Sequence, residues 1–192
     1  MDFRDFTVFP GVYPPSGDTY LLLDSIQVKS DDEFLEVGCG AGLITLSGAR
    51  TAKNAVGVDV SLDAVRNTKE NLRRAGLDQK CSVFQSDLLT SLNSQAKFSL
   101  IIFNPPYLPA DDISTGLDHA LIGGETGAEV TRRFIPQAVD HMVKGGRVFV
   151  VVSTLADNGS IMDTMSTCGL HVEMVSEEPL FFEKIQVLKG TL

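Results

Sequence analysis

The chain has few of the residues that form disulfides or bind metals. Among its 192 residues are three cysteines and three histidines. The cysteines lie far apart without a C-x-x-C pair, and the histidines show no spacing typical of metal ligands. We therefore expect no disulfide framework and no metal site, with buried thiols in a reducing cytoplasm. The six residues are Cys39, Cys81, Cys168, His119, His141 and His171.

Long apolar runs are missing as well. No run approaches the ~20 residues that a membrane-spanning helix needs, and residues 1–5 lack the basic region and cleavage pattern of a secretory signal. A hydrophobic fraction of 43% and a charged fraction of 21% are ordinary for a soluble globular protein. We expect a cytoplasmic protein of one domain, residues 1–192, that does not contact membranes.

Positive charge is also scarce. The formal net charge is −9 and the isoelectric point is near 4.7. Unaided binding to a long nucleic acid depends on neutralising phosphates, so this charge disfavours such a partner. A neutral or basic partner is favoured instead.

Apolar strand-like segments alternate with helical patterns from Glu33 onward. This order predicts an α/β fold with one doubly wound, mostly parallel sheet of seven strands, of which the last is antiparallel. The expected strands are 33–37, 55–58, 81–85, 98–103, 147–153, 171–176 and 182–188, with a short edge strand at 6–9. The expected helices are 18–28, a segment ending near 50, 62–75, 128–142 and 158–168. Residues 108–125 are expected to form a long functional or mobile loop.

The most informative stretch is Asn104-Pro105-Pro106-Tyr107, which follows the buried strand 98–103. Neither proline has an N–H, so the ladder cannot continue, and the preceding residues are pushed into extended geometry. The Asn104 side-chain oxygen and the Pro105 carbonyl can each accept one hydrogen from a planar –NH2 group. The Tyr107 ring offers a face against which a flat group can stack. A rigid turn without chemistry is the alternative.

Three further candidate sites end other expected strands. Gly38-Cys39-Gly40-Ala41-Gly42 reads G-x-G-x-G between a strand and a helix, where small residues and helix amides allow a ligand to approach closely. It is not the dinucleotide pattern G-x-G-x-x-G. Asp59 can accept both hydroxyls of a ribose, or it caps the next helix with Ser61. Asp87 can accept from an adenine amino group or serve as a turn residue.

One ligand crossing these strand ends would meet a glycine loop, a ribose acceptor, an adenine acceptor and a reaction centre. A nucleoside that carries an electrophile fits that order, and S-adenosylmethionine fits best. We expect direct transfer of its methyl group to a nitrogen held at Asn104, with positioning as the main source of catalysis. S-adenosylhomocysteine would be the product.

Glu36-Val37-Gly38-Cys39-Gly40-Ala41-Gly42 resembles motif I of class I methyltransferases, which have a Rossmann-like fold, and Asn104-Pro105-Pro106-Tyr107 resembles their amino-methylating motif IV. The chain is more closely similar to the HemK/PrmC glutamine methyltransferases, in their short archaeal and eukaryotic branch. Three further stretches carry this resemblance, which covers essentially the whole chain. They are Val12-Tyr13-Pro14-Pro15-Ser16-Gly17-Asp18-Thr19, Gly123-Gly124-Glu125-Thr126-Gly127 and Val130-Thr131-Arg132-Arg133-Phe134.

The resemblance implies methylation of the glutamine side-chain amide in the Gly-Gly-Gln motif of class-1 release factors. Residues 1–30 would form part of a cofactor lid, although Pro14 and Ser16-Gly17 depart from the family's usual lid sequence. The implied cofactor-binding residues are Asp18, Thr19, Glu36, Gly38, Gly40, Asp59, Asp87 and Asn104. The implied catalytic residues, which hold the amide, are Asn104, Pro105, Pro106 and Tyr107.

The resemblance also implies a small zinc-ribbon activator that pairs with the third-strand edge, here Cys81 to Ser86. The chain lacks the helical N-terminal domain of the two-domain bacterial enzymes, so docking of the release factor can require such a partner. Two alternatives stay open: an RNA or DNA amino-methyltransferase acting on adenine N6 or guanine N2, and a catalytically idle, cofactor-sensing scaffold.

Overall fold

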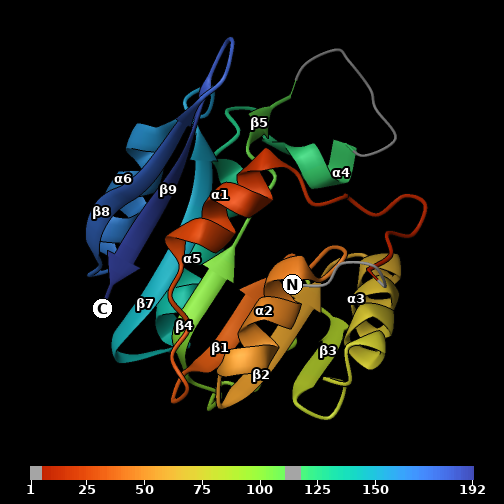
Figure 1. Cartoon of the computed structure of the whole chain (residues 1–192). Helices are drawn as coiled ribbons and strands as arrows, with labels where there is room; N and C mark the ends of the chain where they lie inside the picture. The colour runs from red at the N-terminus through yellow and green to blue at the C-terminus, as the bar shows by residue number, and fades with distance from the viewer. Residues whose placement is uncertain (1–5, 111–117) are drawn as a thin grey trace.

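A seven-stranded sheet forms the centre of the computed structural model, which describes residues 6–110 and 118–192 (Figure 1). The strand order is β3-β2-β1-β4-β7-β9-β8. The strands are β1 (Glu33–Val37), β2 (Asn54–Asp59), β3 (Cys81–Gln85), β4 (Phe98–Phe103), β7 (Met142–Ser153), β8 (His171–Pro179) and β9 (Lys184–Thr191). β9 runs antiparallel to both of its neighbours, while the pairs from β3 to β7 are parallel. This arrangement confirms the predicted doubly wound sheet and its antiparallel last strand.

Helices cover both faces of the sheet. One face carries α1 (Gly17–Ser25), α2 (Leu43–Thr51) and α3 (Leu62–Arg74), and the other carries α5 (Glu129–Asp140) and α6 (Asn158–Thr167). The short helix α4 (Asp118–Leu121) and the two-stranded sheet of β5 (Leu108–Pro109) and β6 (Ile122–Gly124) lie beyond the end of β4 (Figure 1). The layers therefore leave the carboxyl ends of the parallel strands accessible for a ligand.

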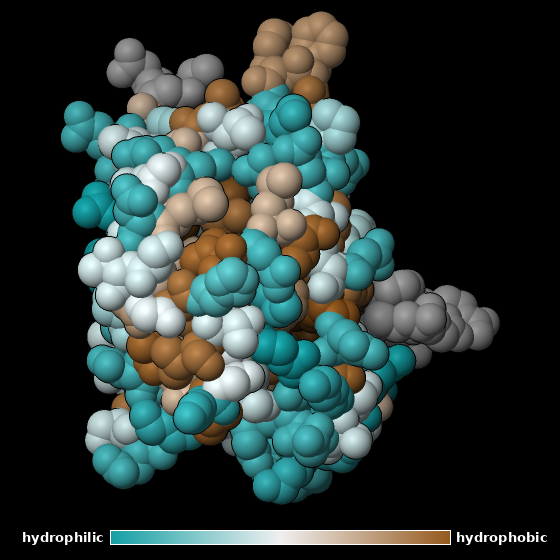
Figure 2. Space-filling model, turned by 90° about the vertical axis from the view of Figure 1, so that its left-hand side faces the viewer, coloured by the Kyte–Doolittle hydropathy of each residue, from teal (hydrophilic) through white to brown (hydrophobic). Residues whose placement is uncertain are grey.

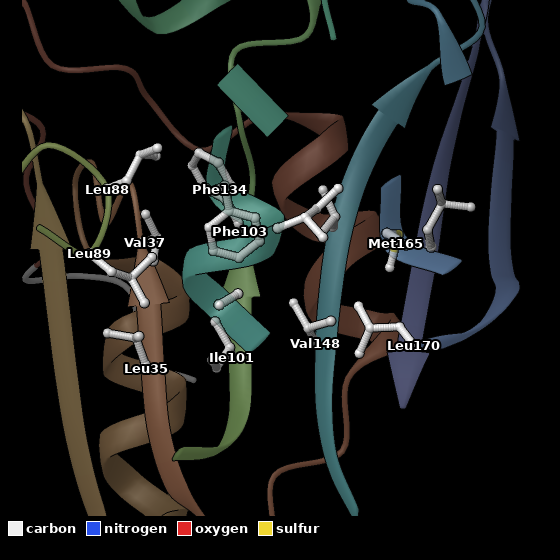
Figure 3. Packing of buried hydrophobic residues seen from close by; sticks show 14 of the residues in the cluster. Leu35, Val37, Leu88, Leu89, Ile101, Phe103, Phe134, Val148, Met165 and Leu170 are labelled. Carbon is white, nitrogen blue, oxygen red and sulfur yellow. The ribbon is translucent and has the colours of Figure 1, made fainter. Parts of the chain in front are cut away.

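The central strands are buried on both faces, as expected for a parallel sheet between two helix layers. Successive side chains point to opposite faces, so Leu35, Ile101 and Phe103 pack toward α5 and α6, while Phe34 and Leu100 pack toward α1, α2 and α3. Figure 3 shows the first of these two clusters, in which the rings of Phe103 and Phe134 lie 4.6 Å apart. This packing holds the end of β4 rigidly.

The prediction of an edge strand at 6–9 is wrong, because this segment pairs with no strand. Its backbone is instead bound by two asparagine side chains of α3. Asn67 accepts from the Phe9 N–H (2.7 Å), Asn71 accepts from the Thr7 N–H (3.0 Å), and both amides donate to the Thr7 carbonyl (2.8 and 2.7 Å). Side chains thus meet the hydrogen-bonding needs that a neighbouring strand would otherwise meet.

Several predicted boundaries shift. The expected loop 108–125 contains β5, α4 and β6, since Ile122 and Gly124 pair with Leu108 and Pro109. Residues 111–117 of that loop lie outside the described part. β7 begins five residues early, at Met142, because 143–146 still bond to the sheet or to the C-terminal residue. β9 begins at Lys184, after a turn at 180–183, and α1 ends at Ser25.

Within the described residues, no helix is long and apolar enough to cross a membrane, and no group of three or more His, Cys, Asp or Glu side chains is placed to hold a metal ion. The three cysteines are free thiols. Cys39 and Cys81 are buried, but Cys168 is only partly buried, which corrects the expectation for that residue.

Candidate functional site

A cavity of about 240 Å³ opens at the carboxyl ends of β1, β2, β3 and β4. The N-terminal segment before α1 forms another of its walls. The structure places every predicted site residue around this one cavity, while their individual roles stay predictions. These residues are Asp18, Thr19, Glu36, Gly38, Gly40, Asp59, Asp87, Asn104, Pro105, Pro106 and Tyr107.

The glycine loop after β1 is held by Asp59 at the end of β2. Asp59 Oδ2 accepts from the Gly40 N–H (2.9 Å), and Oδ1 accepts from the Ser61 N–H (2.8 Å). Gly40 has φ +52°, which disfavours other residues, and a Cβ there would meet nothing closer than the Tyr13 carbonyl oxygen at 3.8 Å. The loop therefore presents open backbone to the cavity, beside the Asp59 carboxylate.

Glu36 lies in β1 beneath the loop, almost completely buried. Thr45 of α2 donates its hydroxyl to Glu36 Oε2 through a short hydrogen bond. Burial raises the pKa of Glu36 to about 8, and the nearby Asp59 carboxylate raises it as well, while the Thr45 hydrogen bonds oppose the shift. With this pKa, Glu36 is mostly protonated at neutral pH.

Glu36 should make the protein less stable as the pH rises. Its pKa is higher in the folded chain (about 8) than its ordinary value of 4.5, so its contribution is fully present below pH 4.5 and is lost as the pH rises through 8. We compare the free energy of unfolding of Glu36→Gln with that of the parent chain. This difference should shift in favour of the variant by about 2–3 kcal/mol between pH 6 and pH 9. Urea unfolding at both pH values measures this difference.

Glu33→Gln is the matched control, since Glu33 lies at the start of the same strand and its pKa is lowered by the hydrogen bond from Lys53. Glu33 titrates below the tested range. The difference in free energy of unfolding between Glu33→Gln and the parent should therefore be the same at pH 6 and pH 9. Parallel curves for Glu36→Gln and the parent would contradict the assignment of a raised pKa.

Asp87 lies at the cavity mouth after β3. Its Oδ2 accepts from Arg133 Nη2 of α5 at 2.8 Å, and both side chains are 56% exposed. The next residue, Leu88, has φ +51°, an uncommon backbone conformation for a residue with a Cβ, and it lines the cavity. Arg133 was missed as a site residue, although it lies in one of the stretches that carry the family resemblance.

In the side chain of Asn104, directly after β4, the nitrogen is hydrogen-bonded and the oxygen is unsatisfied. Its Nδ2 donates to Asp18 Oδ2 at 3.1 Å. Its Oδ1 is buried and has no hydrogen-bond partner. A carboxylate only accepts hydrogen bonds, so Asp18 determines which end of the amide is nitrogen. The free acceptor is the kind of buried polar atom that requires an explanation, and a ligand N–H would satisfy it.

Asp18 connects both sides of the cavity. Besides Asn104, its Oδ2 accepts from the hydroxyls of Tyr107 (3.2 Å) and Tyr13 (3.4 Å), and its Oδ1 accepts from the Thr19 N–H (2.6 Å). Burial, followed by the Asp18 charge, raises the pKa of Tyr107 far above its usual value, so this phenol stays a neutral donor. Tyr13 was not predicted as a site residue.

The backbone of Pro106 and Tyr107 is clamped by glycines of the β6 region. A Cβ on Gly123 would come within 2.4 Å of the Pro106 carbonyl oxygen, and a Cβ on Gly127 within 2.3 Å of the Tyr107 carbonyl oxygen. Only glycine permits this approach without a backbone shift. The glycine-rich stretch that resembles the family thus supports the backbone of the segment 104–107, a role that its sequence did not reveal.

Comparison with known proteins shows the family of the chain. The methyltransferase small domain family model matches residues 8–179. A putative protein N5-glutamine methyltransferase of Methanocaldococcus jannaschii is 36% identical over 185 residues, covering 94% of this chain and 92% of the relative. Methyltransferase HEMK2 of Mus musculus is 31% identical over 177 residues, covering 84% and 81%.

Among solved structures, the E. cuniculi Mtq2–Trm112 complex, described as responsible for methylation of the eRF1 translation termination factor, has a fold similar to this one. Its matching chain has a TM-score of 0.69 and 24% identity, covering 94% of this chain and 98% of that one. That likeness shows the class I methyltransferase fold. The family match and the relatives confirm the resemblance drawn from the motifs: the chain is a methyltransferase and belongs to the HemK-type N5-glutamine methyltransferases of the methyltransferase small domain family.

Proposed function

We propose that this enzyme transfers a methyl group from S-adenosylmethionine to the side-chain amide of the glutamine in the Gly-Gly-Gln motif of a class-1 release factor. The M. jannaschii relative supports a glutamine acceptor by its name. The Mtq2–Trm112 complex supports a release factor, because the protein methylated there is eRF1. S-adenosylhomocysteine is the second product.

The observation that carries the proposal is the buried, unpartnered Oδ1 of Asn104. A primary amide has two N–H groups on one planar nitrogen, and one of them can donate to this oxygen. The Pro105 carbonyl accepts the other, since neither Pro105 nor Pro106 has an N–H that could compete. The Tyr107 ring lies against the flat amide. Together these groups orient a poor nucleophile, and orientation supplies most of the catalysis.

The cavity residues fit the proposed cofactor chemically. Glu36 and Asp59 accept the ribose hydroxyls, Gly38 and Gly40 offer backbone without side chains, and Asp87 accepts from the adenine amino group. When bound, S-adenosylmethionine supplies a methyl group on a positively charged sulfonium. Its positive charge is compatible with a cavity lined by the carboxylates of Asp18, Asp59 and Asp87.

The side chain of Asp18 positions Asn104 in this scheme. Its charge-assisted hydrogen bond holds the Nδ2 end of Asn104, which leaves Oδ1 for the substrate. The amide nitrogen becomes acidic only as its new bond forms, so no general base is needed at the start. Water, or the Asn104 site itself, then takes the proton.

The cofactor lid of this proposal has Asp18 and Thr19 at its centre; of the predicted span 1–30, residues 1–5 lie outside the described part of the chain. Tyr13, Pro15, Asp18 and Thr19 line the cavity, and Ser16 begins α1 with a capping box in which the Ser16 N–H donates to Thr19 Oγ1 (3.3 Å). The departures of Pro14 and Ser16-Gly17 from the usual lid sequence are therefore compatible with a helix start at this point.

A small zinc-ribbon activator completes the proposed assembly. β3 is an edge strand of the sheet, so its outer backbone groups can pair with a strand of another protein. Cys81 to Ser86 contribute this edge, with exposed Ser82 and Gln85 making it polar. The pairing of Mtq2 with Trm112 in the similar complex supports such a partner.

A transfer assay with methyl-labelled S-adenosylmethionine tests the substrate. The acceptors are a release factor carrying Gly-Gly-Gln, its Gly-Gly-Ala variant and total RNA, each with and without the zinc-ribbon protein. We expect label only on the first acceptor. Label on RNA would replace the proposal with an RNA amino-methyltransferase. No label with intact cofactor binding, even with the partner present, would favour a scaffold.

A further inference from the structure

The turn between β8 and β9 exposes two adjacent aromatic side chains. Phe181 is 92% exposed and Phe182 is 85% exposed, and their rings meet edge to face with centroids 4.6 Å apart. The Leu180 N–H donates to the Glu183 carbonyl (2.8 Å) and closes the turn. We call Phe181 and Phe182 the hairpin tip. A hydrophobic projection stands at the upper end of the molecule in Figure 2, where the β8–β9 turn rises in Figure 1.

The hairpin tip projects beyond the carboxyl end of β7, on the β9 side of the candidate active site. Phe103, the last residue of β4, is level with Val150 of β7, and Ser153 is level with Ile185 of β9. The tip therefore extends past the strand ends from which Asn104 and Tyr107 emerge. β9 is two strands from β4, and strands lie about 4.8 Å apart, so the lateral separation is only about 10 Å.

Contacts tie this turn to the site. The Ser153 hydroxyl at the end of β7 donates to Glu183 Oε2 in a short hydrogen bond. The Glu183 charge also acts on Tyr107, whose pKa it helps to raise. The lid helix α1 contacts β7, β8 and β9. The turn is thus held at the end of β7, and the strands that carry it pack against α1, the helix that contains Asp18.

Core packing does not explain why the two residues of the hairpin tip are phenylalanines. Neither phenylalanine belongs to a buried cluster. Single exposed apolar side chains are normal, but two adjacent aromatic rings at a projecting turn beside a site are typical of a contact surface. Aromatic side chains also supply much of the binding energy of protein interfaces.

We propose that the hairpin tip docks the protein that carries the acceptor amide; this inference rests on the proposed function. The amide must reach the buried Asn104 Oδ1, so the backbone that carries it has to lie over the mouth of the cavity. A folded acceptor larger than a few residues then covers the tip. Glu178 and Glu183 flank the two rings, and Glu177 is paired with Lys184 (2.9 Å). Acidic groups thus predominate around the tip, so the docking surface on the acceptor is apolar with basic groups around it.

The double variant Phe181→Ser/Phe182→Ser tests the proposal with two acceptors, an intact release factor and a short peptide containing Gly-Gly-Gln. We expect KM for the release factor to rise 10- to 100-fold, equivalent to about 1.4–2.7 kcal/mol, with kcat unchanged. KM for the peptide and cofactor affinity should stay at parent values, because the peptide fills only the cleft. Met174→Ser is the control, an exposed apolar residue (54%) farther down β8, and it should match the parent.

Direct binding of the release factor, followed by fluorescence anisotropy, separates this inference from the proposed function. Weaker binding to the double variant supports docking even if no label is transferred. Unchanged KM and binding in an active double variant would overturn docking and leave the proposed function intact. An equal loss with the peptide would also overturn it, as would a concentration-dependent dimer of the parent that the double variant abolishes. A parent chain that neither binds nor methylates the release factor would overturn both.

Discussion

Replacing Asn104 with alanine should lower methyl transfer by about 10³-fold or more, while the Kd for S-adenosylmethionine changes less than about threefold. Alanine removes the only side-chain acceptor proposed for the substrate amide, so the nitrogen is no longer held in position. The cofactor keeps the glycine loop, Asp59 and Asp87. Single-turnover transfer measures the first quantity, and calorimetry with the cofactor measures the second.

Asn158→Ala is the matched control for Asn104→Ala. Asn158 begins α6, lies outside the cavity, and also has a buried Oδ1 without a hydrogen-bond partner. Loss of such an atom alone should therefore leave turnover near the parent value. Normal turnover by Asn104→Ala would remove the central role from this residue, and an equal loss in both variants would indicate a general folding effect.

Asp18→Asn should lower kcat by about 10²-fold, with the cofactor Kd and the fold preserved. The asparagine has the same shape and still accepts from the Thr19 N–H, so α1 can begin as before. It no longer provides a carboxylate that only accepts, so the Asn104 amide is free to turn its Oδ1 away from the substrate. Two tyrosine hydroxyls also lose a charged partner.

The division between kcat and cofactor affinity distinguishes two roles for Asp18. If its main role is to close over the cofactor, Asp18→Asn raises the cofactor Kd and leaves kcat at saturation nearly intact. Tyr13→Phe is the control, because it removes the longest of these hydrogen bonds (3.4 Å) and leaves Asn104 held. We expect its kcat within about fivefold of the parent. A kcat loss as large as that of Asp18→Asn would contradict the positioning role.

Sequence patterns predicted those parts of the fold that depend on local chemistry. Continuous apolar runs identified the buried strands, and the two prolines after Phe103 identified where β4 must stop, because they cannot donate to a ladder. Carboxyl ends of parallel strands share one edge, so residues that follow separate strands could be assigned to one site before their positions were known. The prediction of a strand at 6–9 failed because the hydrogen-bond partners of this segment are the side chains of Asn67 and Asn71. The periodicity of apolar residues does not indicate such partners.

The sequence alone thus determined the α/β sheet, the cavity edge and the residue types around it. Only the tertiary structure decided how those residues act on one another. Asp18 and Asn104 are 86 positions apart, and their hydrogen bond exists because α1 packs against β7, β8 and β9. Tertiary packing also decides the close approach of Gly123 and Gly127 to the Pro106 and Tyr107 carbonyls. It likewise leaves Phe181 and Phe182 exposed at the β8–β9 turn. Such contacts depend on packing between distant elements, and no local pattern contains that information.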